Sequence, residues 1–570
     1  AVMHGTGRHH HRHIRRFANA LGTPNCVSSG HCICFGPRVL ACQFTYGTFP
    51  VVDYYGKTKP ACILVWGANP AVSGADCELQ FHIKDAVRAG TKLIVIDPIP
   101  NELTKKAALW LRIRPGSDGA LALGILNILI SEELYDKQFV EKWTYGFAEL
   151  KERCKKYNPK LVSEITWISE EQIIAAARMI AKVKPLSLEW GCAIEHTPNS
   201  FQTVRAIGMI PALTGNFDIP GGFIEGMDAL PGIDILRGSL SDEQRDKCIG
   251  AKAFPFLAGK ANMNPSSHPP LTLEAMITGK PYPIKGALIF GNNSLLSLPN
   301  SKNVYKALLN LDFISCMDLF MTPTAALADL VLPAASWMEL DEVYGGPYRA
   351  EHVVLCQKKV IRTGECKADE EVFLELCKRL GRNYQAETVY DIFDEQLKGI
   401  GEKYPAYKDL DFEKLKKINF IKIPIEYHKY KARGGFKTPS GKVELYSQVM
   451  ADVGADPLPY YEEIPESPYS RPDLAKEYPL ILTTGRRSQQ FFISEHRQIP
   501  SLRKKDPFPR VIINPTTAAQ YGINEGDWIY IEAPRGRITQ KALFEKDIDP
   551  RVINCQMGWW YPEAEGPDYG

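Results

Sequence analysis

One pattern occurs twice in this chain and restricts its fold more than any other feature. CILVWGANPAVS at 62–73 and GALIFGNNSLLS at 286–297 both read as an apolar strand, an aromatic residue, a glycine and then an asparagine. In each copy a helical segment follows, and then a second apolar strand that ends at Asp97 or Asp318. Strands that alternate with helices are typical of a parallel sheet covered on both faces. The repeat therefore predicts two related α/β units.

The landmarks of the repeat are also similarly spaced. Asn69 and Asp97 in the first copy are separated by nearly the same length of chain as Asn293 and Asp318 in the second. A third strand follows in both copies, in RIRPGSD and in LVLPAAS. Ligands of such sheets lie beyond the carboxyl ends of the strands, near helix N-termini. Glycines and polar residues after these strands are therefore candidate nucleotide contacts.

The composition is that of an ordinary globular protein. A chain of 570 residues is too long for one hydrophobic core, so roughly two to four domains are expected. The formal net charge of +2 favours neither nucleic acid nor an anionic membrane surface as a partner. No apolar run approaches the roughly 20 residues of a transmembrane helix. The N-terminus lacks the pattern of a signal peptide.

The 14 cysteines are scattered and are expected to be reduced. The chain contains no C-x-x-C, so a cysteine-rich iron–sulfur run or a zinc ribbon is not expected within it. Cys26, Cys32 and Cys34 lie on a loop between two apolar segments, where soft thiolates could be held for a metal. Packing as small buried side chains is the alternative. The histidines at 9–13 read as a solvated loop rather than a metal tract.

A glycine-rich segment at 186–222 lies between the two copies and reads as a strand, a polar loop, a helix and a turn. Its polar residues and glycines either form an ordinary connection or contact a flat or charged ligand. From Tyr478 onward, short strands separated by glycine-containing turns predict a small β-barrel. The candidates in the glycine-rich segment are Gly191, Glu195, His196, Asn199, Gln202, Gly215, Asn216, Gly221 and Gly222.

Together these motifs resemble the molybdopterin oxidoreductases, the dimethyl-sulfoxide-reductase family of molybdenum and tungsten enzymes. The resemblance implies an α/β fold with two pseudo-symmetric parallel-sheet dinucleotide-binding domains and a C-terminal six-stranded β-barrel of the double-psi type. It covers nearly the whole chain in the order GTPN with the cysteine loop, WGANP, IDP, RPGSDGALALG, GNFDIPGG, ADLVLPAASWMELDE, FKTPSGKVELYS, TTGRRSQQFF, GDWIYIEAPRG and GWWYPE.

The resemblance also implies a division into domains. The first α/β pterin-dinucleotide-binding domain, with the metal-ligand loop, would cover 26–262. The second would cover 263–375, and residues 1–25 would be the end of it. A connecting mixed region at 376–470 would lead to an incomplete dinucleotide-binding barrel at 471–570.

A metal ligand follows from the same resemblance. The family pattern is similar to H-x-C-(aromatic)-x-P, which GHCICFGPR matches with Cys34 as the ligand and Cys32 as the second candidate. A thiolate would complete a sulfur-rich coordination around a high-valent metal with one open position. His31 would be a catalytic residue that carries a proton or donates a hydrogen bond beside the metal.

The implied cofactor is molybdenum or tungsten with two molybdopterin guanine dinucleotides. An aspartate at a strand end can accept hydrogen bonds from guanine, and glycines let backbone N–H groups reach a pyrophosphate. Helix N-capping is the alternative role for Asp97 and Asp329. The cofactor-binding candidates are Gly67, Asn69, Pro70, Asp97, Pro98, Arg114, Gly116, Ser117, Asp118, Gly191, Glu195, Asn199, Gly215, Asn216, Gly291, Asn292, Asn293, Asp318, Thr322, Asp329, Thr484, Gly485, Arg486 and Trp559.

The implied activity is transfer of an oxygen atom, a sulfur atom or a hydride to or from a small-molecule substrate. Cysteine ligation is similar to that of the formate dehydrogenase, polysulfide or thiosulfate reductase, and acetylene hydratase branches. The alternatives are a non-redox tungsten hydratase of the acetylene hydratase type and a metal-free structural subunit on the same scaffold. A plain dinucleotide-dependent dehydrogenase is disfavoured, because no G-x-G-x-x-G follows a strand.

The family usually carries a cysteine-rich segment with a 4Fe–4S cluster upstream of this region. The chain opens without Met and ends on an aromatic segment, so it is expected to be a fragment, with the cluster in the missing upstream part. The resemblance further implies electron transfer in anaerobic respiration through an iron–sulfur partner subunit. Contact with a membrane would occur only through partner subunits.

Overall fold

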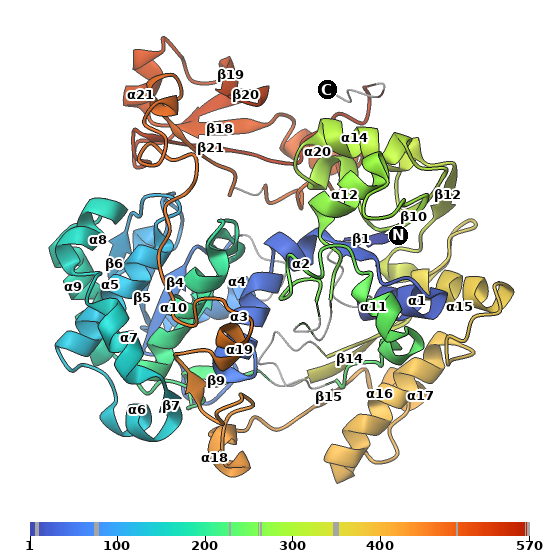
Figure 1. Ribbon diagram of the computed structural model, residues 1–570, viewed down its shortest axis with the longest axis horizontal. Coiled ribbons are helices and arrows are strands. Elements are labelled where there is room, and N and C mark those ends of the chain that lie inside the picture. The colour runs from blue at the N-terminus through green and yellow to red at the C-terminus, as the bar shows by residue number, and fades with distance from the viewer. Residues whose placement is uncertain are drawn as a thin grey trace. The chain divides into compact units, whose positions relative to one another are not determined.

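The computed structural model describes residues 1–5, 11–72, 79–226, 230–259, 262, 265–345, 353–485, 488–564 and 566. The chain forms two compact units, which are described separately below (Figure 1). Unit 1 consists of Ala1–Gly36, Met227–Pro424 and Trp560–Gly570, and unit 2 consists of Pro37–Gly226 and Ile425–Trp559. The five-part division expected from the sequence remains a prediction.

The centre of unit 1 is a five-stranded sheet in which all strands run parallel. Its strand order is β12-β11-β10-β1-β2. The central strands are short and buried, as expected where helices cover both faces. The strands are β1 (Val2–His4), β2 (Cys26–Ser28), β10 (Gly286–Phe290), β11 (Phe313–Asp318) and β12 (Leu330–Pro333).

Helices cover both faces of this sheet. One face packs against α12 and α14 through an apolar cluster that includes Ile289 and Val304. The other face packs against α1 and α15, where the rings of Phe17 and Phe373 stack with centroids 4.5 Å apart. The helices of unit 1 that pack on the sheet are α1 (His11–Leu21), α12 (Pro269–Thr278), α14 (Ser301–Leu309) and α15 (Asp369–Arg379).

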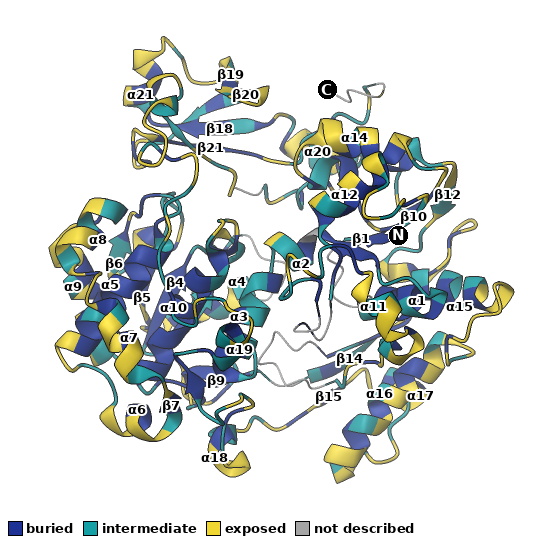
Figure 2. Cartoon of the chain, in the orientation of Figure 1, coloured by how far each residue is buried: buried dark blue, intermediate teal, exposed yellow. Residues whose placement is uncertain are grey.

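A second apolar cluster in unit 1 joins a small antiparallel sheet to two helices. Phe393 and Phe412 lie at its centre, and Figure 2 shows the outer faces of these helices exposed to solvent. The elements are β13 (Glu342–Tyr344), β14 (Val353–Gln357), β15 (Phe420–Lys422), α16 (Val389–Lys403) and α17 (Phe412–Ile418).

The centre of unit 2 is a four-stranded parallel sheet in the order β6-β5-β4-β8. On one face lies α5, whose sequence is apolar on all sides. This fits its buried position, since four helices that are given below, α7 to α10, surround it. The other face packs against α4. The strands are β4 (Cys62–Trp66), β5 (Lys92–Ile96), β6 (Leu109–Leu111) and β8 (Leu186–Trp190). The helices are α4 (Leu79–Arg88), α5 (Asp118–Ser131), α6 (Lys137–Trp143), α7 (Phe147–Cys154), α8 (Pro159–Thr166), α9 (Glu170–Lys182) and α10 (Ser200–Leu213).

The two parallel sheets share a backbone arrangement, which confirms the repeat seen in the sequence. Gly67 after β4 donates its N–H to the carbonyl of Ile96 at 3.0 Å, and Gly291 after β10 donates to Met317 at 3.1 Å. Both glycines have positive φ angles, +56° and +50°, which favour glycine. The neighbouring strand in each sheet is also followed by a glycine, Gly191 after β8 and Gly5 after β1.

The C-terminal part of unit 2 is a mixed five-stranded sheet in the order β17-β21-β18-β20-β19. The family resemblance implied a six-stranded barrel, whereas the described residues form five strands here. Their apolar core includes Val511, Ala542 and Cys555. The strands are β17 (Ile481–Thr483), β18 (Arg510–Ile513), β19 (Trp528–Ala533), β20 (Gly536–Phe544) and β21 (Val552–Cys555).

The histidine-rich N-terminal segment differs from the expected solvated loop. Residues 6–10 lie outside the described part, but α1 begins at His11, and His13 is buried. The reason is that α1 packs on the sheet through Ile14 and Phe17, and this includes the first turn of the helix. All cysteines in the described part are free thiols, as expected. Among the helices that are described, none has the length and apolarity needed to cross a bilayer.

Candidate functional site

The cysteine loop follows β2 of unit 1. It contains the short helix α2 (Ser29–Ile33), then Cys34, and then α3 (Gly36–Tyr46). Cys34 has φ −108° and ψ −113°, outside the helical region, and is half-buried. The Sγ of Cys32 instead lies 3.6 Å from the carbonyl oxygen of Ser28, one turn earlier in the chain. Of the two candidate ligands, Cys34 therefore lies between two helices, whereas the thiol of Cys32 contacts the backbone of its own helical turn.

Two aromatic side chains flank the cysteine loop. The ring of His31 has its centroid 5.3 Å from that of Phe35 and 6.0 Å from that of His4. His4 is the last residue of β1, and its Nδ1 lies 2.6 Å from the carbonyl oxygen of Gly5. Sequence reasoning missed His4, because a three-residue strand leaves little periodicity to recognise. The structure thus brings two imidazoles together within unit 1.

From Pro37 onward α3 belongs to unit 2, and its first turn is held by contacts within that unit. Arg38 Nε lies 2.8 Å from Glu195 Oε1, and an Arg38 Nη1–H also donates to the carbonyl of Trp190 at the end of β8. Burial raises the pKa of Glu195, and the charge of Arg38 opposes this rise. Glu195 was predicted as a cofactor contact, whereas here it holds α3. Arg38 was not predicted as a site residue. The signal that could have pointed to it is its position directly after Gly36 and Pro37, at the start of a helix.

The carboxyl edge of the sheet in unit 2 holds two half-buried carboxyl groups. Asp97 accepts from the N–H of Ile99 at 2.8 Å and from Asn101 Nδ2 at 3.2 Å. Asp118 accepts from Trp66 Nε1 at 2.8 Å. Burial raises the pKa of Asp97 to about 7, and the nearby Asp118 carboxyl acts in the same direction. Burial also raises the pKa of Asp118. Two adjacent carboxyls are thus available as acceptors for amide and amine donors.

Backbone at this edge is closely packed. An added Cβ on Gly191 would lie 2.2 Å from the carbonyl oxygen of Gly67, and its N–H donates to the carbonyl of Trp66 at 3.0 Å. A Cβ on Gly116, whose φ is +83°, would lie 1.9 Å from Ile464 Cδ1. Ser117 Oγ donates to the Arg114 carbonyl at 2.8 Å. Asn69, Pro70 and Pro98 follow β4 and β5 at the same edge.

Arg114 was predicted to contact the cofactor, but the structure gives it an internal role. Its guanidinium binds both carboxylate oxygens of Glu463, at 2.8 and 2.7 Å, and the hydroxyl of Tyr461 at 2.8 Å. Its Nε donates to the Ile165 carbonyl at 2.5 Å. Every nitrogen of this buried side chain therefore has a partner. Although burial raises it, hydrogen bonds from Arg114 and Tyr461 hold the pKa of Glu463 near 2.

Three predicted residues of unit 2 are not brought to this edge as free groups. Asn216 is buried, and its Oδ1 accepts from the N–H of Leu186 at the start of β8, the opposite edge of the sheet. Gly215 is next to it, and a Cβ there would lie 2.4 Å from an oxygen of Asp136. Asn199 Nδ2 donates to the Tyr460 carbonyl at 2.7 Å. Hydrogen bonds and close packing within the protein therefore account for the residue types at these three positions.

The carboxyl edge of the sheet in unit 1 has the same backbone close approach. An added Cβ on Gly5 would lie 2.3 Å from the carbonyl oxygen of Gly291, and Gly5 donates its N–H to the Phe290 carbonyl at 3.3 Å. Asp318 accepts from the N–H of Phe320 at 3.3 Å, and burial raises its pKa. Sequence reasoning missed Gly5, whose position mirrors that of Gly191.

Polar residues surround this edge. Asn293 Oδ1 accepts from the hydroxyl of Thr324 at 2.8 Å. Asn292 Oδ1 accepts from the hydroxyl of Ser297 at 3.2 Å, and Thr322 Oγ1 accepts from the N–H of Ala325 at 3.2 Å. Thr324 was not predicted. Its part in orienting Asn293 depends on a contact across 31 residues of chain, which the sequence does not reveal.

Asp329 lies at the other edge of the unit 1 sheet. It precedes β12, and its Oδ2 accepts from the N–H of Ile314 near the start of β11 at 2.7 Å. It therefore ties two strands together at their amino ends and does not join Asp318. The helix-capping alternative does not describe it either, because the N–H that it binds belongs to a strand.

The described barrel candidates follow strands of the C-terminal sheet, β17 and β21. Thr484 and Gly485 are exposed just after β17. Trp559 Nε1 donates to Gln556 Oε1 at 3.0 Å, and the guanidinium of Arg497 lies 3.8 Å from the centroid of its ring. Arg486 is outside the described residues.

Two family models match this chain. The molybdopterin oxidoreductase model matches residues 5–379, and the molybdopterin dinucleotide binding domain model matches residues 480–568. This chain belongs to the molybdopterin oxidoreductase family. The match confirms the family predicted from the sequence, and the second model indicates a molybdopterin cofactor that carries molybdenum or tungsten.

Several members of the family are similar to nearly the whole chain. Acetylene hydratase from Syntrophotalea acetylenica is 34% identical, over 98% of this chain and 78% of that protein. The alpha subunit of F420-dependent formate dehydrogenase from Methanocaldococcus jannaschii is 31% identical, over 86% of this chain and 71% of that protein. The solved structure of acetylene hydratase from Pelobacter acetylenicus has a TM-score of 0.89 at 32% identity and covers 99% of this chain and 80% of that one.

Buried polar atoms at the unit 1 edge provide a test of whether a molybdopterin cofactor fits. Ser28 Oγ, Ser294 Oγ and Asn293 Nδ2 are buried and have no hydrogen-bond partner. Buried polar groups almost always have one. Ser28 is the last residue of β2, and Asn293 and Ser294 follow β10, at the edge where a dinucleotide would lie in a parallel sheet. The residues present therefore fit a polar ligand at this edge. Within the part of the chain that is described, no three His, Cys, Asp or Glu side chains form a metal-binding group.

Proposed function

We propose that this chain is the catalytic part of a molybdenum or tungsten enzyme that binds two pyranopterin guanine dinucleotides, with Cys34 as the protein ligand of the metal. The observation that carries the proposal is the position of Cys34 at a break between two helices, while Cys32 contacts its own turn. A half-buried thiolate on a loop between elements is a soft donor held in a defined direction.

The carboxyl edges of the two sheets would each hold one dinucleotide. Gly5 with Gly291, and Gly67 with Gly191, let neighbouring strand ends pack closely, because a Cβ at Gly5 or Gly191 would collide with a carbonyl oxygen. Their own N–H groups bind sheet carbonyls, so the loops beyond them would supply the N–H groups that approach a pyrophosphate. Asp97 and Asp318 occupy equivalent strand ends, where a carboxylate can accept from the N1–H and amine of guanine. Ser28, Ser294 and Asn293 would supply further hydrogen bonds in unit 1.

When bound, the cofactor would supply a metal that changes oxidation state by two electrons and has one position open to a small substrate. The residues of this chain would hold it and handle protons. His31 and His4 lie beside the cysteine loop, and an imidazole can hold or release a proton near neutral pH. Phe35 would shield one side of His31 from water.

The proposed reaction is oxidation or reduction of a small substrate, with electrons passing to an iron–sulfur partner subunit. Formate dehydrogenase among the similar proteins supports this class. The test is metal content and dye-coupled activity with formate or thiosulfate for the wild type, Cys34→Ala and the matched variant Cys32→Ala. We expect Cys34→Ala to lose at least about 1,000-fold in activity and Cys32→Ala to stay within about tenfold of the wild type. A Cys34→Ala variant with normal activity would refute the ligand assignment.

Hydration without net electron transfer is the second candidate. It is favoured by the similarity to acetylene hydratase over 98% of the chain and by the TM-score of 0.89. A hydratase forms product from acetylene without consuming an oxidised or reduced dye, whereas a dehydrogenase or reductase changes the dye in step with product. A purified chain that contains neither molybdenum nor tungsten would contradict both candidates and favour a structural subunit.

A further inference from the structure

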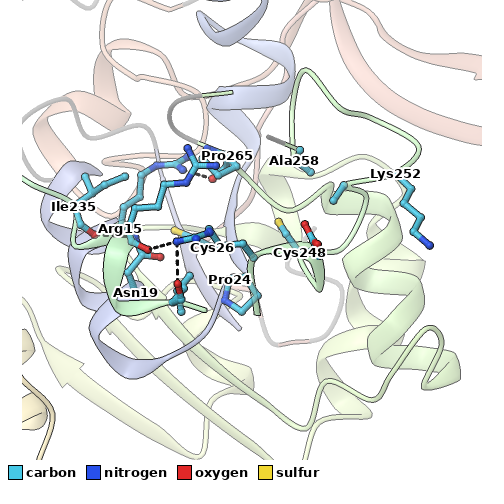
Figure 3. Close-up of a pocket in the computed structure, with 15 residues that line it drawn as sticks. Arg15, Asn19, Pro24, Cys26, Ile235, Cys248, Lys252, Ala258 and Pro265 are labelled. Carbon is cyan, nitrogen blue, oxygen red and sulfur yellow. Dashed lines mark hydrogen bonds between the residues drawn. The ribbon is translucent and has the colours of Figure 1, made fainter. Parts of the chain in front are cut away.

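Unit 1 contains a cavity of about 370 Å³ that the proposed function does not use. Its walls come from α1, from the turn into β2, from residues 235–259 and from Pro265, and Figure 3 shows the side chains around it. None of the residues proposed to hold the metal or the dinucleotides lines it. Its volume is in the range of sites for small organic molecules.

Arg15 of α1 is the distinctive residue of this cavity. Its side chain is buried, with 2% of the residue exposed. Nη1 donates to the carbonyl of Pro265, but Nε and Nη2 have no hydrogen-bond partner. These two nitrogens lie on one edge of the planar guanidinium and point the same way, which is the arrangement that binds two oxygens of a carboxylate or phosphate. A buried cation without such a partner is costly.

The charges around the cavity are mainly positive. Arg237 and Lys252 also line it, and Asp246 is the single carboxylate among the lining residues and is exposed to solvent. Arg245, the remaining cation, is paired with Asp242 at 2.7 Å. The cavity therefore has an excess of positive charge, with the buried charge of Arg15 uncompensated.

The thiols beside Arg15 do not supply a negative charge. Cys26 and Cys248 both line the cavity and are buried. Burial raises the pKa of Cys26 to about 11 and also raises that of Cys248, so both are neutral near pH 7. They act as small apolar wall residues, together with Leu240 and Ala258.

We propose that this cavity binds a small organic carboxylate through the Nε and Nη2 of Arg15. The unpartnered edge of the guanidinium fits two carboxylate oxygens, and the cations raise the local anion concentration. The apolar wall favours a ligand with a short hydrocarbon part over an inorganic oxyanion. The inference goes beyond the proposed function, because it concerns a site away from the residues proposed for the cofactor.

Binding of butyrate to the purified chain, with its cofactor loaded, tests the proposal. Titration calorimetry or ligand-observed NMR would compare butyrate with butyramide, which has the same shape without the charge, and with inorganic phosphate. We expect butyrate to bind and the other two to bind at least about tenfold more weakly. Failure of butyrate to bind, or tighter binding of phosphate than of butyrate, would overturn the proposal.

Substitutions locate the binding. Arg15→Met should weaken butyrate binding by roughly 10- to 100-fold, and Arg15→Lys, which keeps the charge but not the planar edge, by about tenfold. Arg178→Met removes an exposed arginine of unit 2 that pairs with Glu132, and it should leave binding unchanged. Should Arg15→Met not fold, the Lys variant still decides the matter. Equal butyrate affinity in the wild type and in Arg15→Lys would contradict the role of the guanidinium edge.

Discussion

The carboxyl edges of the two parallel sheets share a backbone arrangement but differ in how completely their side chains are hydrogen-bonded. In unit 2, Trp66 binds Asp118, and Asn101 binds Asp97. In unit 1, Ser28 Oγ, Ser294 Oγ and Asn293 Nδ2 are buried without partners. Edges with the same glycine positions therefore differ in how many of their buried polar side-chain atoms already have a hydrogen-bond partner.

This difference in hydrogen bonding predicts a different free-energy change at each edge when a ligand binds. An edge whose polar groups are already paired is preorganised and gains little internal order on binding. An edge with unpaired buried groups gains hydrogen bonds only from the ligand, so ligand binding contributes more to its stability. We expect unit 1 to depend on the cofactor more strongly than unit 2.

The largest effect should come from the paired glycines. Gly5→Ala and Gly191→Ala each place a Cβ within 2.3 Å of a carbonyl oxygen, so each should lower stability by about 3 kcal/mol. Calorimetric unfolding measures this loss. Gly238→Ala, whose Cβ meets no atom within 4 Å and whose φ, like those of Gly5 and Gly191, is not positive, is a control for the added methyl group alone. Unequal losses of stability in Gly5→Ala and Gly191→Ala would contradict the equivalence of the two glycine positions.

Arg114 tests whether the unit 2 edge is held by internal pairing. Arg114→Met leaves Glu463 without its partner and should cost about 3 kcal/mol, with little change in bound nucleotide. The wild type should also lose stability as pH falls from 4.5 toward 2, because the folded state holds the pKa of Glu463 low. The variant should show a weaker acid dependence, because Tyr461 still donates a hydrogen bond to Glu463. If Arg114→Met instead loses bound nucleotide while its stability is unchanged, Arg114 contacts the cofactor and the internal role is contradicted.

Asp97 gives a pH dependence of opposite sign. Burial raises its pKa from 3.8 to about 7, so the folded state binds this proton more tightly than the unfolded state does. In cofactor-free protein, stability should fall as pH rises between these values, and Asp97→Asn should be more stable than the wild type above pH 7 by about 2 kcal/mol. Melting temperatures across pH measure the difference. A difference that does not change with pH would contradict this account.

The smallest expected effect is the loss of a single hydroxyl group at each edge, Ser117 in unit 2 and Ser294 in unit 1. Ser117 Oγ has a partner, so Ser117→Ala should cost about 1 kcal/mol with or without cofactor. Ser294 Oγ has none, so Ser294→Ala should be neutral or slightly stabilising without cofactor and should cost about 1 kcal/mol with it. Melting temperatures of loaded and cofactor-free protein provide the four comparisons. Identical behaviour of the two variants would remove the distinction between the edges.

The sequence predicts the parallel sheets well, because each strand, its terminal glycine and the following helix are local patterns. It does not predict the pairing of Arg114 with Glu463, which joins residues 349 positions apart. It also does not reveal that Asp329 and Asn216 bind backbone N–H groups near the amino ends of strands, since a polar residue beside a strand does not show which end of the sheet it occupies. His4 ends, and Gly5 follows, a strand that is too short to recognise in the sequence.

The central claim is that both edges hold a dinucleotide that serves one metal atom. It is tested most directly by hydrolysing the purified, loaded chain and counting the guanosine monophosphate released for each molybdenum or tungsten atom. The account predicts two guanosine monophosphates for each metal atom, one from each edge. A ratio of one, or a metal without guanosine monophosphate, would contradict it.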